Sequence, residues 1–366
     1  MTATEKKVRI GVIGAGSWAI SNHIPILAER DDVELVSAVR KGRDALESIG
    51  ERFGFSHLSE NYRDALDQGL DAVVVASPPG LHHEHAKAAM EAGADVLCEK
   101  PFTVDPADAW DLHRTADRLR RHLMISFGWN YGTLGIEAKR LMDEEGGVGE
   151  VEHVMVSMAS GTRELLTSTG GGGYEGSAEG FAPEAATWTD PALSGGGYAP
   201  AQISHAMGLA MWLTGDRAQE VFAFMNNRGA RVDLHDAVSL RYASGATGSI
   251  SGASCPGPAN AIDEPDEPWP RHQLQVRLYG SEGQLIADLE RDFLWLYRND
   301  GLDIKVDLPR HAGLYTCDGP PDTLVDLAQG RDVPNRSPAD LGARTVEVVA
   351  AAERSAQSGN VVRVGD

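Results

Sequence analysis

The first third of the chain alternates short apolar runs with longer amphipathic segments. The runs are rich in Val, Ile and Ala and predict strands, and the segments between them carry apolar residues at helical spacing. Strand–helix alternation of this kind predicts a doubly wound parallel sheet, an α/β domain over residues 1–127. The predicted strands are Val8–Ile13, Val33–Val39, Ala72–Ala76, Asp95–Cys98 and Leu123–Ser126, and the predicted helices are Ile24–Arg30, Asp44–Phe53, His82–Ala92 and Pro106–Arg120.

After Trp129 the pattern changes to one helix followed by strands that are joined mainly by turns. This predicts an α+β domain over residues 128–366 with a mostly antiparallel sheet. The predicted helix is Leu134–Glu145, and the predicted strands are Val151–Ala159, Glu220–Asn226, Ala237–Tyr242, Thr247–Ser251, Leu274–Tyr279, Gly283–Asp288 and Phe293–Arg298. The long polar segment Gly161–Gly197 is either a lid or a surface excursion, and Ile262–Pro270 is expected to be a solvated loop.

Composition narrows the range of partners. The 366 residues carry 54 acidic and 33 basic side chains, a net charge of -21, which disfavours nucleic acid and anionic membranes as partners. No run of 18 apolar residues and no signal-peptide pattern occurs. Cys98, Cys255 and Cys317 are odd in number and widely spaced, which fits a reducing compartment. We therefore expect a cytoplasmic protein.

The segment GAGSWA follows the first predicted strand and opens a helical segment. In a G-x-G-x-x-G/A turn the first glycine permits a tight turn, the second lets the backbone approach a pyrophosphate, and the small last residue permits close helix packing. The alternative is a glycine-rich turn that serves packing alone. The residues expected to contact a dinucleotide here are Gly14, Gly16, Ser17 and Trp18.

The end of the second predicted strand indicates which dinucleotide binds. NAD sites normally place Asp or Glu there, whereas this chain has Arg40, Lys41 and Arg43. Cations at this point suit the 2′-phosphate of NADP, which arginine binds through its planar fork. NADP is favoured and NAD remains possible, since these residues can also be ordinary solvated charges or Arg40 can stack on adenine.

Two further motifs follow parallel strands, at the edge where open α/β sheets bind ligands. In ASPPGLH we expect Ser77, Pro78 and His82 to lie beside the cofactor. The HHEH run that begins at His82 suggests a metal site, but adjacent helical histidines diverge in direction, so no metal is predicted.

The second of these motifs is CEKPF, in which Lys100 lies between Glu99 and Pro101. The proline favours an extended lysine exposed to the crevice. The pKa of lysine is about 10.4 when unperturbed, and burial or a neighbouring cation must lower it before the amine accepts a proton near neutrality. The alternative is a surface lysine before a turn.

The last motif is SGGGYAPAQISHAMG. Pro200 indicates the first turn of a helix, which places Ala201 and His205 on one side at helical spacing, with Tyr198 just before the helix. His205 then faces either the crevice or the core.

These motifs, in this order, resemble the Gfo/Idh/MocA family of oxidoreductases, named for glucose–fructose oxidoreductase and inositol dehydrogenase. The resemblance also includes VRLYGSEGQL and extends over nearly the whole chain. It implies a Rossmann domain, a second domain with a large open sheet used for assembly into homodimers or homotetramers, and a C-terminal helix that packs back on the first domain. It also implies pyridine-nucleotide-dependent oxidation or reduction of a sugar, sugar derivative or cyclitol.

By the same resemblance, Lys100 contacts substrate and cofactor, and His205 is the acid/base at the reacting hydroxyl. Glu99, beside Lys100, is expected to contact the cofactor. The family aspartate falls on Ala201, and Tyr198 is the better polar substitute, ahead of Gln202. Two alternatives stay open on this scaffold: a glycosidase that uses NAD transiently, and a non-catalytic sensor of nucleotide or sugar.

Overall fold

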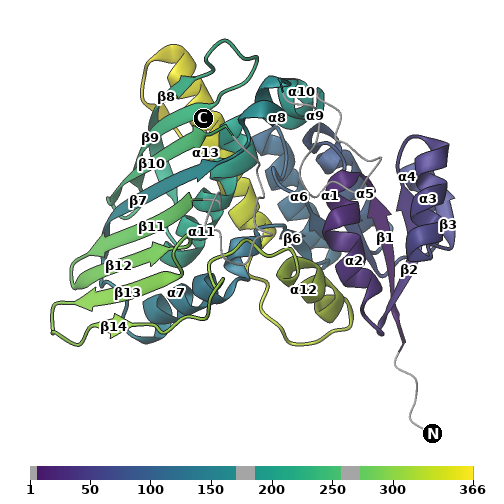
Figure 1. The fold of residues 1–366 in the computed structure, drawn as a ribbon, viewed down its shortest axis with the longest axis horizontal. Coiled ribbons are helices and arrows are strands. Elements are labelled where there is room, and N and C mark those ends of the chain that lie inside the picture. The colour runs from purple at the N-terminus through teal and green to yellow at the C-terminus, as the bar shows by residue number, and fades with distance from the viewer. Residues whose placement is uncertain (1–5, 170–185, 257–272, 366) are drawn as a thin grey trace, which may run out of the picture.

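The computed structural model describes residues 6–169, 186–256 and 273–365. They form two β-sheets with helices between them and on the outer face of the first sheet (Figure 1). The predicted fold class, a doubly wound α/β domain followed by an α+β domain, is confirmed. Among these residues no helix has both the length and the apolar composition needed to cross a lipid bilayer.

The first sheet has six strands in the order β3-β2-β1-β4-β5-β6, and every neighbouring pair is parallel. The order reverses between β1 and β4, and the carboxyl ends of these two strands are the place where open α/β sheets bind ligands. The strands are almost wholly buried because helices cover both faces. Their bounds are β1 Val8–Ile13, β2 Val33–Val39, β3 His57–Ser59, β4 Ala72–Val75, β5 Asp95–Cys98 and β6 Leu123–Ile125.

The helices of this domain begin and end at recognisable signals. Asp105 caps α6 by accepting a hydrogen bond from the Ala107 amide, and Gly54, at φ +79°, ends α3. In place of the single predicted helix Ile24–Arg30 there are two short helices that meet at Asn22. The bounds are α1 Ser17–Ser21, α2 His23–Ala28, α3 Arg43–Phe53, α4 Tyr62–Leu66, η1 Pro79–Leu81, α5 His82–Glu91, α6 Pro106–Leu119 and η2 Gly128–Asn130.

The second sheet has nine strands in the order β14-β13-β12-β11-β7-β10-β9-β8-β15. Only β7 and β10 pair in parallel, and all other neighbours are antiparallel. Their bounds are β7 Val151–Ser160, β8 Ala218–Asn226, β9 His235–Tyr242, β10 Thr247–Ser254, β11 Gln273–Gly280, β12 Gly283–Asp288, β13 Phe293–Arg298, β14 Ile304–Lys305 and β15 Val362–Arg363.

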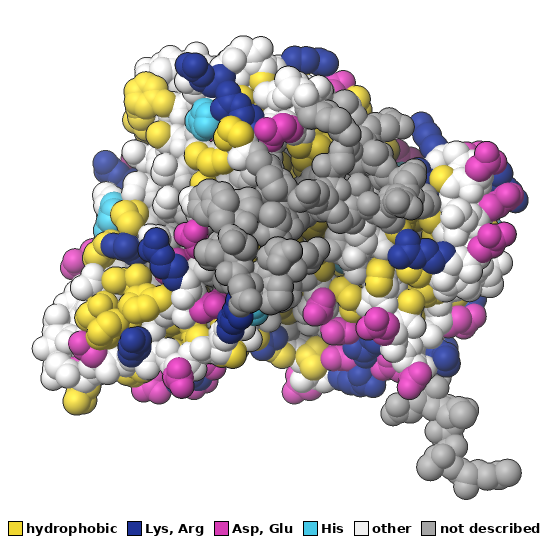
Figure 2. All heavy atoms as spheres, viewed as in Figure 1, with side chains coloured by type: hydrophobic (Ala, Val, Ile, Leu, Met, Phe, Trp, Pro, Cys, Tyr) yellow, Lys and Arg dark blue, Asp and Glu magenta, His cyan; other side chains and the backbone are white. Residues whose placement is uncertain are grey.

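The two faces of this sheet differ in exposure. Along β13, Leu294 and Leu296 are fully buried, whereas the alternating residues Phe293, Trp295 and Tyr297 are partly exposed. The rings of Trp295 and Tyr297 stack with centroids 4.5 Å apart. Figure 2 shows hydrophobic side chains gathered on this part of the molecule, toward β13 and β14. One face of the sheet therefore packs on the core and the other carries aromatic rings outward.

The helices of the second half connect the two sheets. Helix α11 packs on β7 and helix α13 packs on both β8 and α6, and both lie between the sheets in Figure 1. Helix α12 docks on the first domain through Arg30, which lies 2.8 Å from Asp322 and 3.0 Å from Asp326. The bounds are α7 Thr133–Glu144, α8 Arg163–Thr167, α9 Ala186–Thr189, α10 Pro191–Ser194, η3 Ala199–Ile203, α11 Ser204–Thr214, α12 Gly319–Ala328 and α13 Ala339–Ser358.

The long polar segment Gly161–Gly197 is more regular than expected where it is described. It contains α8 and the short helices α9 and α10, and α10 packs on η1 of the first domain. Residues 170–185, and the predicted loop Ile262–Pro270, lie outside the described residues.

Candidate active site

The turn after β1 has the geometry that a dinucleotide needs. Gly14 has φ +91°, and a Cβ at this position would lie 2.3 Å from the Ser77 amide nitrogen. The turn therefore packs tightly against the end of β4. At Gly16 the nearest atom to such a Cβ is 3.9 Å away, so the missing side chain leaves room beside the backbone. Ala19 is fully buried. These observations fit a pyrophosphate approaching at Gly16.

Glu99, at the end of β5, links the glycine turn to the next loop. One carboxylate oxygen accepts hydrogen bonds from Trp18 Nε1 at 2.8 Å and lies 2.6 Å from His23 Nε2. Burial by itself would raise the pKa of Glu99, but the bond to His23 and the charges of His23 and Lys100 outweigh it and lower that pKa to about 2. The group is therefore a buried, ionised carboxylate that holds α1, α2 and the β5 loop together.

Lys100 reaches from this loop to the second domain. Its Nζ donates a hydrogen bond of 3.1 Å to the carbonyl oxygen of Ala201 and lies 5.8 Å from the centroid of the Trp18 ring. Burial lowers the pKa of Lys100, and the charge of Glu99 opposes part of that effect. The amine is therefore closer to neutrality than a surface lysine.

His205 lies in the first turn of α11, four residues after Ala201. It is 4% exposed, and its ring packs edge-on against Phe127, Trp129 and Tyr315, with centroids 6.1, 5.4 and 5.0 Å away. Ala201 lies in η3, a π-helical turn of a kind often found at functional sites. Through its bond to the Ala201 carbonyl, the Lys100 amine contacts the turn immediately preceding His205.

His82 connects the two loops at the crevice. It is fully buried, with Nε2 2.6 Å from the Ser77 carbonyl oxygen and Nδ1 2.9 Å from the Pro101 carbonyl oxygen. Burial lowers the pKa of His82, and the hydrogen bonds to the backbone oppose part of that shift. His83 and His85 face other partners, Asp111 and the Ser77 hydroxyl. The three imidazoles of HHEH are therefore separately engaged, and His82 holds Ser77 and Pro78 in place.

Tyr198 lies in the core of the second domain, against β7. Its side chain is fully buried, and its hydroxyl accepts a hydrogen bond from the Ser160 hydroxyl at 3.2 Å and donates to the Met158 carbonyl at 3.4 Å. Burial raises its pKa. This placement argues against the predicted role of Tyr198 as a substitute for the family aspartate. Its position before the helix suggested proximity to His205, but the ring turns toward β7.

The basic residues after β2 fall into two groups. The Arg40 guanidinium lies 3.4 Å from the Ala15 carbonyl oxygen, beside the glycine turn, and Lys41 is exposed. Arg43 is bonded to Glu47 at 2.7 Å along the exposed face of α3. Glu60 approaches the same turn, and its carboxylate accepts a 2.6 Å hydrogen bond from the Gly42 amide. Of the three cations, Arg40 is therefore the one placed beside the glycine turn.

Several residues of the site carry no signal in the sequence. Tyr315 donates a hydrogen bond of 3.1 Å to the Ser126 carbonyl and forms one wall beside His205. The Cys317 thiol is close enough to Lys100 and Glu99 for their charges to act on it, and burial raises its pKa. Both belong to an irregular segment before α12. His23, by contrast, does carry a signal in the sequence. It is a polar residue in the otherwise apolar segment HIPIL, and a buried polar side chain needs a hydrogen-bond partner.

Both halves of the chain match models of known domains. A model of an oxidoreductase family with an NAD-binding Rossmann fold matches residues 8–127. A model of the GFO/IDH/MocA C-terminal domain matches residues 136–286.

Individual curated proteins are also similar to this chain in sequence. D-glucoside 3-dehydrogenase of Escherichia coli (strain K12) is 30% identical over 149 residues, which is 40% of this chain and 42% of that protein. D-xylose 1-dehydrogenase (NADP(+)) of Haloarcula marismortui is 30% identical over 169 residues, 45% of this chain and 47% of that protein. The match therefore spans less than half the length of these curated relatives.

A solved structure of an oxidoreductase domain protein from Kribbella flavida has the same fold throughout. It superposes with a TM-score of 0.79 at 22% identity and covers 99% of this chain and 100% of that chain. Because the two family models match both halves in order, the chain belongs to the Gfo/Idh/MocA family of oxidoreductases.

Proposed function

We propose that this protein is an NADP-dependent dehydrogenase or reductase that acts on a secondary hydroxyl or ketone of a sugar, sugar derivative or cyclitol. The observation that carries the proposal is the 3.1 Å hydrogen bond from Lys100 Nζ to the Ala201 carbonyl, four residues before His205. It joins the cofactor loop of the first domain to the helix that carries the histidine. The sugar-oxidising relative from Escherichia coli supports this substrate class.

Lys100 and His205 have complementary roles at one substrate oxygen. The nicotinamide, when bound, exchanges a hydride with the substrate carbon. His205 takes or returns the hydroxyl proton, and Lys100 donates a hydrogen bond that stabilises negative charge developing on that oxygen. The aromatic walls around His205 exclude water, which strengthens both interactions. Lys100 exchanges its bond to the Ala201 carbonyl for one to the substrate.

The alanine at position 201 sets this chain apart from the family pattern. The family aspartate would place a carboxylate near the histidine, whereas here the backbone carbonyl of Ala201 holds the lysine. The Tyr198 hydroxyl is bonded to Ser160 and Met158 of β7. The proton path therefore consists of His205 and Lys100 without a third side-chain acid.

The end of β2 supports NADP over NAD. Arg40 follows β2 directly, at the position where NAD sites carry an acidic residue. Arg40 and Lys41 supply two positive charges, whereas Glu60 supplies one negative charge and already accepts the Gly42 amide. The local charge is therefore positive in a chain of net charge -21, which favours the dianionic 2′-phosphate.

The test is a fluorescence titration of the protein with NADPH and NADH, followed by an absorbance screen over sugars and cyclitols. We expect tighter binding of NADPH, and oxidation of at least one polyol with NADP. Arg40→Gln should weaken NADPH binding by about ten- to a hundredfold and change NADH binding little, since a charged hydrogen bond contributes about 1.5–3 kcal/mol. Equal binding of both nucleotides by the wild type would reject NADP, and the absence of turnover on the whole panel would favour the sensor alternative.

The open face of the nine-stranded sheet supports pairing of two copies. Its outward aromatic residues, such as Trp295 and Phe224, with 69% of Phe224 exposed, form the kind of surface that protein contacts bury. We infer a cytoplasmic homodimer or homotetramer assembled through this face. Light scattering at micromolar concentration tests it, and a monomer would contradict it.

A further inference from the structure

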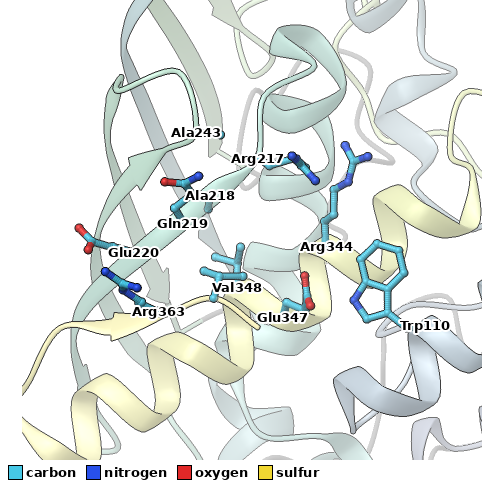
Figure 3. Close-up of a pocket in the computed structure, with 11 residues that line it drawn as sticks. Trp110, Arg217, Ala218, Gln219, Glu220, Ala243, Arg344, Glu347, Val348 and Arg363 are labelled. Carbon is cyan, nitrogen blue, oxygen red and sulfur yellow. The ribbon is translucent and has the colours of Figure 1, made fainter. Parts of the chain in front are cut away.

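A second cavity lies away from the crevice, at the junction of the two domains. It has a volume of about 510 Å³ and opens between α6, α13 and the β8–β15 edge of the second sheet (Figure 3). Trp110 of α6 forms one side, and Arg217 enters from the connection between α11 and β8. Arg344 of α13 and Arg363 of β15 complete the basic part of the lining. We call this cavity the arginine pocket.

The arginine pocket is separate from the candidate active site. Helix α11 runs from Ser204 to Thr214, with His205 in its first turn and Arg217 three residues beyond its end. Over the nine steps from His205 to Thr214 the helix rises about 13 Å, and no residue of the Lys100 loop lines the pocket. A ligand in the pocket therefore does not contact the loop of Lys100.

The guanidinium groups of the pocket are incompletely paired. Arg344 forms an ion pair of 2.9 Å with Asp340, but its Nε is buried and has no hydrogen-bond partner. Within the described ranges, no hydrogen bond or ion pair involves the side chains of Arg217 and Arg363. Figure 3 shows the side chains of Arg217 and Arg344 extending toward each other. Like charges brought together in this way repel each other, and an anion between them would remove the repulsion.

Acidic residues compensate only part of this charge. Glu220 lies at the rim and is held by Arg241 at 3.3 Å, and Glu347 is the other carboxylate of the lining. Asp340 pairs with Arg344, and even with Glu347 counted against a second arginine, one of the three arginine charges is left in a protein of net charge -21. A basic hollow on an acidic protein concentrates small anions and excludes large polyanions.

We propose that the arginine pocket binds a small molecule that carries a phosphate group. A phosphate monoester bears a charge of about -1.5 to -2 near neutral pH. Such a ligand suits two guanidinium groups better than a ligand with a single carboxylate, which carries a charge of -1. Arginine binds phosphate oxygens through paired N–H donors. Trp110 supplies a flat apolar surface for the ring of a sugar or base. The volume admits a molecule the size of a sugar phosphate or mononucleotide.

The test uses inorganic phosphate and pyrophosphate as probes, titrated calorimetrically into the full-length protein with NADPH at saturation so that the cofactor site is filled. We expect saturable binding with a Kd of about 1 mM or tighter, accompanied by a change in tryptophan fluorescence that Trp110→Phe removes. Arg217→Gln and Arg363→Gln should each weaken binding by about tenfold. Both side chains are exposed, so neither variant endangers folding.

Two controls make the result decisive. Arg291→Gln removes an arginine that is 71% exposed and lies outside the pocket, and it should leave phosphate binding unchanged. Lys100→Met should also bind phosphate normally, which separates this inference from the proposed enzymatic function. The absence of saturable binding, or equal weakening in Arg291→Gln and Arg217→Gln, would overturn the proposal.

Discussion

The two glycines of the β1–α1 turn should lose different properties when the same methyl group is added: Gly14→Ala should lose stability, and Gly16→Ala should lose NADPH affinity. Gly14 has φ +91°, a conformation that costs alanine about 1–2 kcal/mol. Its Cβ would also lie 2.3 Å from the Ser77 amide nitrogen and 2.5 Å from the Ala76 carbonyl carbon. Both are backbone atoms of the β4 end, so relieving the overlap requires the turn to move away from the sheet.

Overpacking of this kind costs about 1–3 kcal/mol. Added to the conformational cost, Gly14→Ala should lose about 2–5 kcal/mol of unfolding free energy. For domains of this size each kcal/mol lowers the melting temperature by about 2–4 °C. A drop of roughly 4–20 °C in the melting temperature, followed by circular dichroism, is therefore expected for Gly14→Ala.

Gly16→Ala is the matched variant. Gly16 has φ −90° and ψ −172°, which any residue adopts, and the nearest atom to its added Cβ is 3.9 Å away. Its stability should stay within about 0.5 kcal/mol of the wild type. The new methyl group would nevertheless occupy the approach of the pyrophosphate, so NADPH affinity should fall by about tenfold or more. Unchanged stability in Gly14→Ala, or unchanged NADPH affinity in Gly16→Ala, would refute this account of the turn.

Three further predictions concern buried groups. Because the folded pKa of Glu99 is about 2 and its unfolded value is 4.5, its stabilisation of about 3 kcal/mol is present above pH 4.5 and is lost as the pH falls toward 2. Denaturant titrations across this range should show a smaller loss of stability in Glu99→Gln than in the wild type, since Asp32 and Asp111 also have pKa values lowered to about 2 and titrate in both proteins. Tyr198→Phe should cost about 1 kcal/mol of stability and keep kcat within about threefold. A hundredfold loss of kcat would show that the Tyr198 hydroxyl takes part in the reaction. Burial and the carboxyl of Asp233 raise the pKa of Asp236 to about 9. The folded chain therefore holds a proton that the unfolded chain releases, and stability falls as the pH rises from about 4 to 9. Asp236→Asn should be more stable than the wild type at pH 8, and an equal or lower melting temperature of the variant would contradict this.

Much of the fold follows from local patterns in the sequence. The strands of the parallel sheet are continuous apolar runs because both of their faces are covered, and the strands of the second sheet alternate because one face is exposed. The bounds of β12 and β13 were predicted to the residue. Strands β3, β14 and β15 were not predicted, because two or three residues are too few to show the alternation of apolar and polar side chains.

The local pattern also fails to mark two longer helices, although the family resemblance implies the second of them. Helix α12 begins with Gly319, Pro320 and Pro321, which indicate a turn when read locally. Helix α13 carries small buried residues on most of its circumference, because it packs on both α6 and β8, so it lacks a single apolar stripe.

The site shows the same division between local and long-range information. Glycine turns, the EKP motif and the histidine are short motifs, and their positions along the strands could be predicted. The bond of Lys100 to the Ala201 carbonyl joins residues 101 positions apart, and the aromatic wall from Tyr315 comes from a third segment. The orientation of Tyr198 depends on the packing of η3 against β7 and β10, which no local pattern encodes.

The central claim is that Lys100 and His205 act on the same substrate oxygen. A double-mutant cycle on kcat/KM, with Lys100→Met, His205→Asn and the combined variant on any sugar that the screen identifies, tests it most directly. Groups that act as a unit give losses that do not multiply, so the double variant should be no slower than about the slower of the two single variants. If the two losses multiply, or if either single variant retains the wild-type rate, the lysine and the histidine do not form one catalytic unit.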